Sequence, residues 1–285
     1  MKRRDQLSEA IFFTLFRGSA FAAIALLVLV VVLLAIAGHS VIDWRFLSAS
    51  WQHQDITSGG IFPAILGSVY LGLGVIAISF PFGVATAVFL TEYGKHSRWR
   101  RLIQLAIRNL AGVPSVVYGL FGLAVFVHAM NMGMSLIAAV FTLSVMTLPW
   151  IITSSVEALE AVPQQFRDSS LALGATKWQT IARIVLPTAL PGCLTGGIVG
   201  MARALGETAP IILVGATFFL THLPSSVFDK YMALPYHVFI LSTQHASPHA
   251  QEYAAGSALV LMIVTFLLSL GAIILRYRFR RQKVW

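Results

Sequence analysis

The sequence predicts an all-α membrane protein with six transmembrane helices and both termini in the cytoplasm. The first observation is composition: of 285 residues, 57% are hydrophobic and only 11% are charged, and the mean hydropathy is +0.80. A soluble domain carries about a quarter charged residues. The other two observations are the number of long apolar stretches and the placement of lysine and arginine between them.

A helix needs about 20 mostly apolar residues to cross a bilayer. Six stretches meet this requirement, at residues 21–37, 61–90, 102–130, 135–156, 189–219 and 254–275. The second, third and fifth are longer than a bilayer requires, so we expect them to bend or to extend beyond the hydrocarbon. Proline removes a backbone donor and clashes with the preceding turn. The expected places for bends are therefore Pro81, Pro114, Pro149, Pro191 and Pro210.

Lysine and arginine favour the cytoplasmic loops of membrane proteins. Sixteen of the 20 basic residues lie in the two terminal tails and in the loops after the second and fourth stretches. Arg45 and Lys230 lie on the opposite side, and Arg108 and Arg203 lie within stretches. An even number of spans agrees with both termini being cytoplasmic. Because the basic residues do not share one soluble face, we expect contact with membrane lipid and none with nucleic acid.

Three regions follow from this pattern. Residues 1–60 form a cytoplasmic tail, a first helix and an outer loop; residues 61–275 form a five-helix core with a cytoplasmic loop at 157–187; residues 276–285 form a basic tail. Ala35, Ile36 and Ala37 before Gly38 are similar to a signal-peptidase site. The apolar run is longer than a usual signal core, so we expect the first helix to be retained.

Neither cysteine nor histidine points to a metal site. The single cysteine, Cys193, excludes an internal disulfide framework and is expected to pack in an apolar span. The outer loops, at 38–60 and 220–253, hold six histidines without a ligand spacing. These are His39, His53, His222, His237, His245 and His249. We therefore predict no metal site. Because the sequence shows no nucleophile–base pair and no HExxH, we also predict no catalytic residue.

The polar segment 164–187 predicts two short helices joined by a turn. Apolar residues recur there at intervals of three, four or seven, which indicates one helical face; they are Phe166, Leu173, Trp178, Ile181 and Val185. Pro163 suits a helix start, and Gly174 with Ala175 suits a tight turn. A simple amphipathic loop that rests on anionic lipid is the alternative.

The same segment resembles the cytoplasmic loop of binding-protein-dependent ABC transporter permeases. That loop has the form E-A-A, three residues, Gly, nine residues, then Ile, any residue and Leu-Pro. This chain has Asp168, Ser169, Ser170, Gly174, Ile184, Leu186 and Pro187 at that spacing. The resemblance implies the type I ABC importer permease fold, with a coupling loop seated in a cleft of a separate ATPase subunit and Gly174–Ala175 at its tip. The chain has no G-x-x-x-x-G-K-[ST] motif of its own. The resemblance therefore implies that this chain binds no cofactor and that the partner subunit binds ATP.

Arg203 and Glu207 lie four residues apart in the fifth stretch, so a continuous helix would place them on one face. A charge near the bilayer centre costs at least ~2.5–3.5 kcal/mol, so this pair should face a partner or a watery cavity. One interpretation is a structural ion pair. The other is an anion-selective constriction, in which the Arg203 fork binds oxyanions and Glu207 tunes the site or accepts a proton. Small residues nearby would allow close helix packing; they are Gly196, Gly197, Gly200, Ala202, Ala204 and Gly206.

The segments ARALGETAP at 202–210 and AGVPSVVYG at 111–119 resemble the phosphate-specific permeases of the PstA type, in the CysTW/PstA–PstC-like group. The resemblance implies a permease subunit of an ATP-driven importer of inorganic phosphate in the cell inner membrane. It implies three partners: a PstC-type permease, a PstB-type ATPase dimer and a PstS-type periplasmic phosphate-binding protein. Arg203 and Glu207 would be the pathway residues, and Arg108 would snorkel.

Two alternatives remain open. The nearer is an ABC permease for molybdate, sulfate or phosphonate. The farther is an ion-coupled secondary carrier with Arg203 and Glu207 as a proton relay, which predicts inverted repeats that the sequence does not display.

Overall fold

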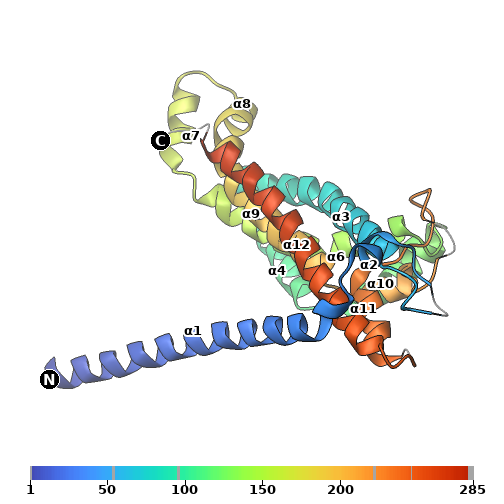
Figure 1. The fold of residues 1–285 in the computed structure, drawn as a ribbon. Coiled ribbons are helices and arrows are strands. Elements are labelled where there is room, and N and C mark those ends of the chain that lie inside the picture. The colour runs from blue at the N-terminus through green and yellow to red at the C-terminus, as the bar shows by residue number, and fades with distance from the viewer. Residues whose placement is uncertain (1, 53–54, 95–96, 221–222, 245, 282–285) are drawn as a thin grey trace.

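The computed structural model describes residues 2–52, 55–94, 97–220, 223–244 and 246–281. These ranges are helical apart from turns, loops and one isolated β-bridge between Ala216 and Tyr231 (Figure 1). The elements are α1 Lys2–Gly38, η1 His39–Val41, α2 Trp44–Ser48, α3 Phe62–Val88, η2 Phe89–Tyr93, α4 Arg98–Ala111, α5 Ser115–Gly122, η3 Leu123–Ala129, α6 Leu136–Glu160, α7 Gln164–Ala172, α8 Lys177–Thr180, η4 Ile181–Val185, α9 Leu186–Leu205, α10 Ala209–Val214, α11 Leu234–Thr243 and α12 Ala250–Arg281.

In the described part of the chain, the number of spans is five or six, depending on how one bent pair of helices is counted. Within the described ranges, five helical segments are long and apolar enough to cross a membrane: Phe12–Val41, Phe62–Tyr93, Leu136–Glu160, Lys177–Leu205 and Ala250–Arg278. A sixth span exists only if the pair Arg98–Ala111 and Ser115–Ala129 is counted as one, and this pair is bent by 102°.

The expected third span at 102–130 is therefore not one helix, and the bend expected at Pro114 is confirmed. The chain leaves the helix after Ala111, and Pro114 is the N-cap of α5. Proline disfavours helical geometry in the residue before it, which accounts for the break at this position.

The expected fifth span at 189–219 has other bounds and is interrupted just before Pro210, one of the expected places for a bend. Its helix is already formed at Lys177, ends at Leu205 with Gly206 as C-cap, and resumes for six residues as α10. The prolines do not all act alike. Pro81, Pro149 and Pro191 lie inside α3, α6 and α9 without ending them.

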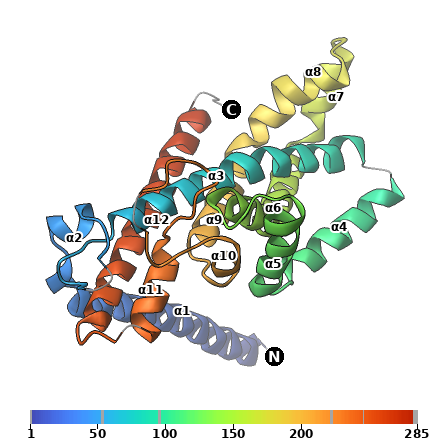
Figure 2. The ribbon, with the colours of Figure 1, turned by 90° about the vertical axis from the view of Figure 1, so that its right-hand side faces the viewer.

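Helices α3, α6 and α9 form the packed centre of the molecule (Figure 2). Glycines face larger side chains at their crossings: a methyl group added at Gly192 would lie 2.6 Å from Ala158 Cβ, and one added at Gly83 would lie 2.5 Å from Ile151 Cγ2. Close approach over small residues is how membrane helices gain packing without a hydrophobic driving force.

Helix α1 extends away from this centre (Figure 1), and its side chains from Phe12 to Val30 are exposed. It meets α12 at Gly38, where an added methyl group would lie 2.5 Å from the nitrogen of Gly256. An apolar helix with this exposure is suited to a lipid environment.

Different elements gather at the two ends of the molecule. Helices α7 and α8 and the C-terminal end of α12 lie at one end, and α2 and α11 lie at the other (Figures 1 and 2). At the second end the loop before α11 caps α6, because Leu136 N donates to Asp229 O at 3.0 Å and Ile137 N donates to Val227 O at 2.9 Å. These bonds satisfy amides that a helix start leaves without partners.

The histidines are dispersed. His237 is buried in α11 beside Trp51 and Phe218 rather than in a loop, and His53, His222 and His245 lie outside the described residues. Across the described ranges there is no group of three His, Cys, Asp or Glu side chains that would hold a metal ion. Cys193 is buried, as expected.

Candidate functional site

Arg203 and Glu207 meet where helix α9 stops. Arg203 is in the last turn of α9, Gly206 is its C-cap, and Glu207 follows the cap. Arg203 Nε lies 3.8 Å from Glu207 Oε1, and the two side chains are 47% and 17% exposed. The pair predicted from the sequence therefore exists, but the turn after α9 brings the side chains together rather than one face of a continuous helix.

Trp150 of α6 completes this group, and the sequence analysis missed it. The Arg203 Cζ atom lies 4.9 Å from the centre of the Trp150 ring, which is a cation–π contact. In the part of the chain that is described, no hydrogen bond is formed by Nη1 or Nη2 of Arg203. The indole of Trp150 thus covers one face of the guanidinium, and the Nε edge faces the Glu207 carboxylate. The outer edge, formed by Nη1 and Nη2, remains available to donate to a hydrogen-bond acceptor.

The pair lies level with the middle of α6. Gly196 of α9 is against Ser154 of α6, and Gly200 is against Ile151. Arg203 follows Gly200 by less than one turn, which brings it level with the central part of α6. Helices broken at mid-membrane depth are where transporters place ion and substrate sites, because the break frees polar groups only where they line a cavity.

The segment 157–187, for which the resemblance implies a coupling role, is called the coupling loop below. Its part 164–187 has the predicted helix–turn–helix form. Pro163 is the N-cap of α7, and Gly174 has a φ of +83°, which only glycine adopts easily. Thr176 then caps α8 through a capping box with Gln179, with bonds of 3.3 and 2.8 Å. Ser170 is buried and shares a hydrogen bond of 2.9 Å with Thr180, which joins the two helices.

The motif positions divide between the surface and the interior. Asp168, Ser169 and Gly174 are exposed on α7 and its turn, and Ala175 is partly buried. Ser170 is buried, and the remaining three are partly buried where the chain enters α9; they are Ile184, Leu186 and Pro187. The exposed members are therefore accessible at the surface of the loop, while Ile184, Leu186 and Pro187 lie at the junction of η4 and α9.

The predicted single apolar face of this loop is wrong. Leu173 is 89% exposed and Trp178 is 63% exposed, whereas Ile181 and Val185 are buried. The turn at Gly174 interrupts the helical phase, so residues before and after it cannot share one face. The tip of the loop consequently presents two large apolar side chains to its surroundings.

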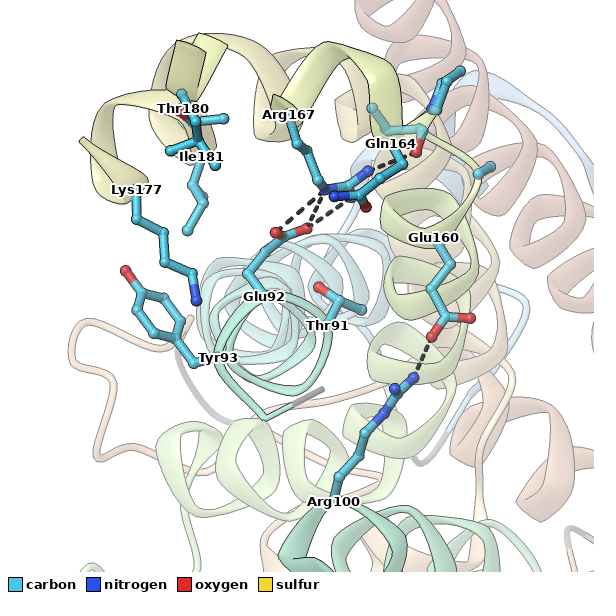
Figure 3. A pocket seen from close by; sticks show the side chains of 14 residues that line it. Thr91, Glu92, Tyr93, Arg100, Glu160, Gln164, Arg167, Lys177, Thr180 and Ile181 are labelled. Atoms are coloured by element: carbon cyan, nitrogen blue, oxygen red, sulfur yellow. Dashed lines mark hydrogen bonds and ion pairs between the residues drawn. The ribbon is translucent and has the colours of Figure 1, made fainter. Parts of the chain in front are cut away.

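Arg167 anchors the loop, although in the sequence it is only one of the basic residues after the fourth stretch. Its guanidinium donates to both carboxylate oxygens of Glu92, with contacts from 2.7 to 3.3 Å (Figure 3). It also donates to the carbonyl oxygens of Val162 at 2.6 Å and Leu159 at 2.9 Å. Glu92 and Arg167 lie 75 residues apart, so no local pattern indicates their contact.

A pocket of about 740 Å³ lies between this ion pair and the ends of α4 and α6 (Figure 3). A second ion pair, Arg100 with Glu160, and the ammonium of Lys177 over the ring of Tyr93 at 4.6 Å also line it. The pocket borders the coupling loop, at the end of the molecule opposite α2 and α11.

Comparison with known proteins assigns the chain to a class. Residues 79–283 match the family described as binding-protein-dependent transport system inner membrane component, and the chain belongs to this family. It is 31% identical over 292 residues to the phosphate transport system permease protein PstA 1 of Mycobacterium tuberculosis (strain CDC 1551 / Oshkosh), covering 98% of this chain and 91% of the relative. It is 36% identical over 248 residues to the probable ABC transporter permease protein YqgH of Bacillus subtilis (strain 168), covering 83% and 77%.

Solved structures show the same fold. A bacterial alginate ABC transporter in complex with an alginate-bound periplasmic protein matches with a TM-score of 0.67 at 17% identity, over 94% of each chain. The methionine ABC transporter MetNI matches with a TM-score of 0.60 at 17% identity, over 77% of this chain and 94% of the other. The chain is thus a permease subunit of an ABC importer with the type I fold, a transport component of several membrane-spanning helices.

Proposed function

We propose that this protein is the membrane permease subunit of an ATP-driven importer of inorganic phosphate, and that Arg203 binds the anion during passage. The observation that carries the proposal is the open outer edge of the Arg203 guanidinium at the break between α9 and α10. A planar guanidinium edge matches two oxygens of a phosphate group. The PstA names of several relatives support phosphate as the substrate.

Glu207 has a defined part in this proposal. A conduction site must bind its ion strongly enough to admit it and weakly enough to release it. The Glu207 carboxylate, 3.8 Å from the Arg203 guanidinium, offsets part of the positive charge and repels the bound anion. It thereby prevents the site from becoming a trap.

The partners follow from the same proposal. A PstS-type periplasmic phosphate-binding protein docks on the outer loops, a PstC-type permease completes the pathway, and a PstB-type ATPase dimer binds the coupling loop. The exposed Asp168, Ser169, Leu173 and Trp178 support the last contact. This arrangement requires both termini and the coupling loop to be cytoplasmic, at the inner membrane.

In the proposed cycle the chain catalyses no chemistry. ATP closes the ATPase dimer, the dimer carries the coupling loop with it, and α6 and α9 shift because the loop is continuous with both. The relative positions of Trp150 on α6 and Arg203 on α9 then change, and access to the anion switches between the two sides of the membrane.

Uptake by the complete complex in liposomes tests the proposal. We expect accumulation of labelled phosphate that needs ATP inside, the binding protein outside and the ATPase. Competition by unlabelled molybdate, sulfate or phosphonate that exceeds competition by phosphate would point to another oxyanion. Phosphate accumulation driven by a proton gradient in vesicles that lack the ATPase would instead indicate a secondary carrier.

A further inference from the structure

One side chain joins three separate segments at the coupling loop. Arg167 belongs to α7, its ion-pair partner Glu92 belongs to η2 at the end of α3, and its two carbonyl acceptors belong to the last turn of α6 and the residues after it. The Arg167 and Glu92 side chains are only 12% and 9% exposed. This group, Arg167 with Glu92 and the carbonyls of Leu159 and Val162, is called the clasp below.

The clasp gives α3 a link to the coupling loop that the backbone does not provide. The coupling loop continues directly into α6 on one side and α9 on the other, so a force on the loop reaches those helices through the backbone. Helix α3 has no such connection. The end of α3 meets the loop through side chains: Leu90 belongs to the same apolar cluster as Ile181, and Arg167 reaches Glu92 beside the pocket of about 740 Å³ (Figure 3).

Helix α3 also lies close to the candidate anion site. A methyl group added at Gly72 would lie 2.8 Å from the side chain of Leu205, two residues after Arg203. One added at Gly197 would lie 2.9 Å from Phe80. If α3 stayed in place while α9 moved, these contacts would slide or separate.

We propose that the clasp is a positioning device that makes α3 move with α6 and α9 when the ATPase drives the coupling loop. This inference rests on the proposed function for the identity of the motor. Arg167 is suited to the task because its planar fork binds Glu92 and the carbonyls in fixed directions at once. Lysine, with a point charge on a flexible stem, would not hold three segments in one geometry.

The test uses the complete transporter in liposomes, with Arg167→Gln, Glu92→Gln and the double variant. The matched control is Arg100→Gln, which removes the other ion pair at the same pocket without touching α7. Three quantities are measured: phosphate uptake, ATP hydrolysis and the distance between spin labels at Phe89 and Gln165, both exposed. The distance is compared between the nucleotide-free and ATP-trapped states.

We expect the label distance to stay constant between states in the unsubstituted and Arg100→Gln proteins and to change in Arg167→Gln. Uptake per ATP should fall about tenfold in Arg167→Gln, in the range of mutations along coupling elements. The double variant should be no worse than Arg167→Gln, because the two residues act as one unit. Arg167→Lys should remain poorly coupled.

A label distance in Arg167→Gln that stays constant between states would overturn the proposal. So would a proportional fall of uptake and hydrolysis with reduced recovery of the complex, which would mean a purely structural ion pair. If the unsubstituted transporter does not import phosphate, the proposed function fails, but the label distances still decide whether the clasp couples α3 to the ATP cycle.

Discussion

The guanidinium of Arg203 lies over the indole ring of Trp150, with its Cζ atom 4.9 Å from the ring centre. The two residues belong to α9 and α6, the helices that the coupling loop joins. Because the ring covers one face of the guanidinium, it restricts the plane in which the fork presents its donors. A shift between α6 and α9 would therefore alter the proposed anion site directly.

Replacing Trp150 should weaken anion binding. Trp150→Leu removes the cation–π contact, and we expect the KM for transport to rise about threefold, in line with about 0.5–1 kcal/mol at an exposed site. Trp150→Phe retains a ring and should lie between this variant and the unsubstituted protein. Initial uptake rates at varied substrate concentration measure the effect, and equal KM values for all three proteins would remove Trp150 from the site.

Replacing Glu207 should have the opposite effect on affinity. Glu207→Gln removes a repulsion of about 1 kcal/mol between unit charges near 4 Å in a water-like environment, so KM should fall about fivefold. The maximal rate should fall as well, because release becomes slower. Glu207→Asp keeps the charge and serves as the control. A higher KM in Glu207→Gln would contradict the tuning role and would favour a direct binding role for the carboxylate.

The tip of the coupling loop should tolerate strain better than charge. Gly174 has a φ of +83° and open space around it, so Gly174→Ala should cost only the backbone strain, about 1–2 kcal/mol. A bulky charge at this tip, as in Gly174→Glu or Ala175→Glu, should in addition prevent seating in the ATPase. Co-purification of the ATPase with tagged permease measures this, and normal stoichiometry for the Glu variants would argue against contact at the tip.

Packing between α6 and α9 should depend on the absence of side chains at Gly196 and Gly200. Gly196→Leu would overpack the contact with Ser154, and we expect a loss of about 1–3 kcal/mol of stability. Gly271→Leu on α12, where an added methyl group meets nothing within 4 Å, is the matched control. Thermal denaturation of the purified complexes in detergent compares them; equal midpoints for both variants would show that α9 repacks freely.

Features that local chemistry determines were predictable from the sequence. Pro163 and Gly174 mark a helix start and a left-handed turn whatever surrounds them, and the structure confirms both. Bends were expected at Pro114 and Pro210, and the chain leaves its helices just before both. Which of the five prolines would interrupt a helix was not predictable, because Pro149 lies within an unbroken helix.

Contacts between distant segments account for the remaining misses. The Arg167–Glu92 pair spans 75 residues, and the Arg203–Trp150 contact joins two helices, so neither leaves a signal at any fixed spacing. The exposure of Leu173 was missed because the periodicity was carried through a turn that resets it.

Arg203 is the group that the anion passes in the proposed mechanism. The direct measurement is ATP-driven uptake of labelled phosphate by liposomes that contain complexes with Arg203→Gln or Arg203→Lys, with recovery of the assembled complex and ATP hydrolysis measured in parallel. We predict that Arg203→Gln assembles and hydrolyses ATP but imports no phosphate, and that Arg203→Lys retains slow import. Import at the unsubstituted rate by the Arg203→Gln complex would contradict the account.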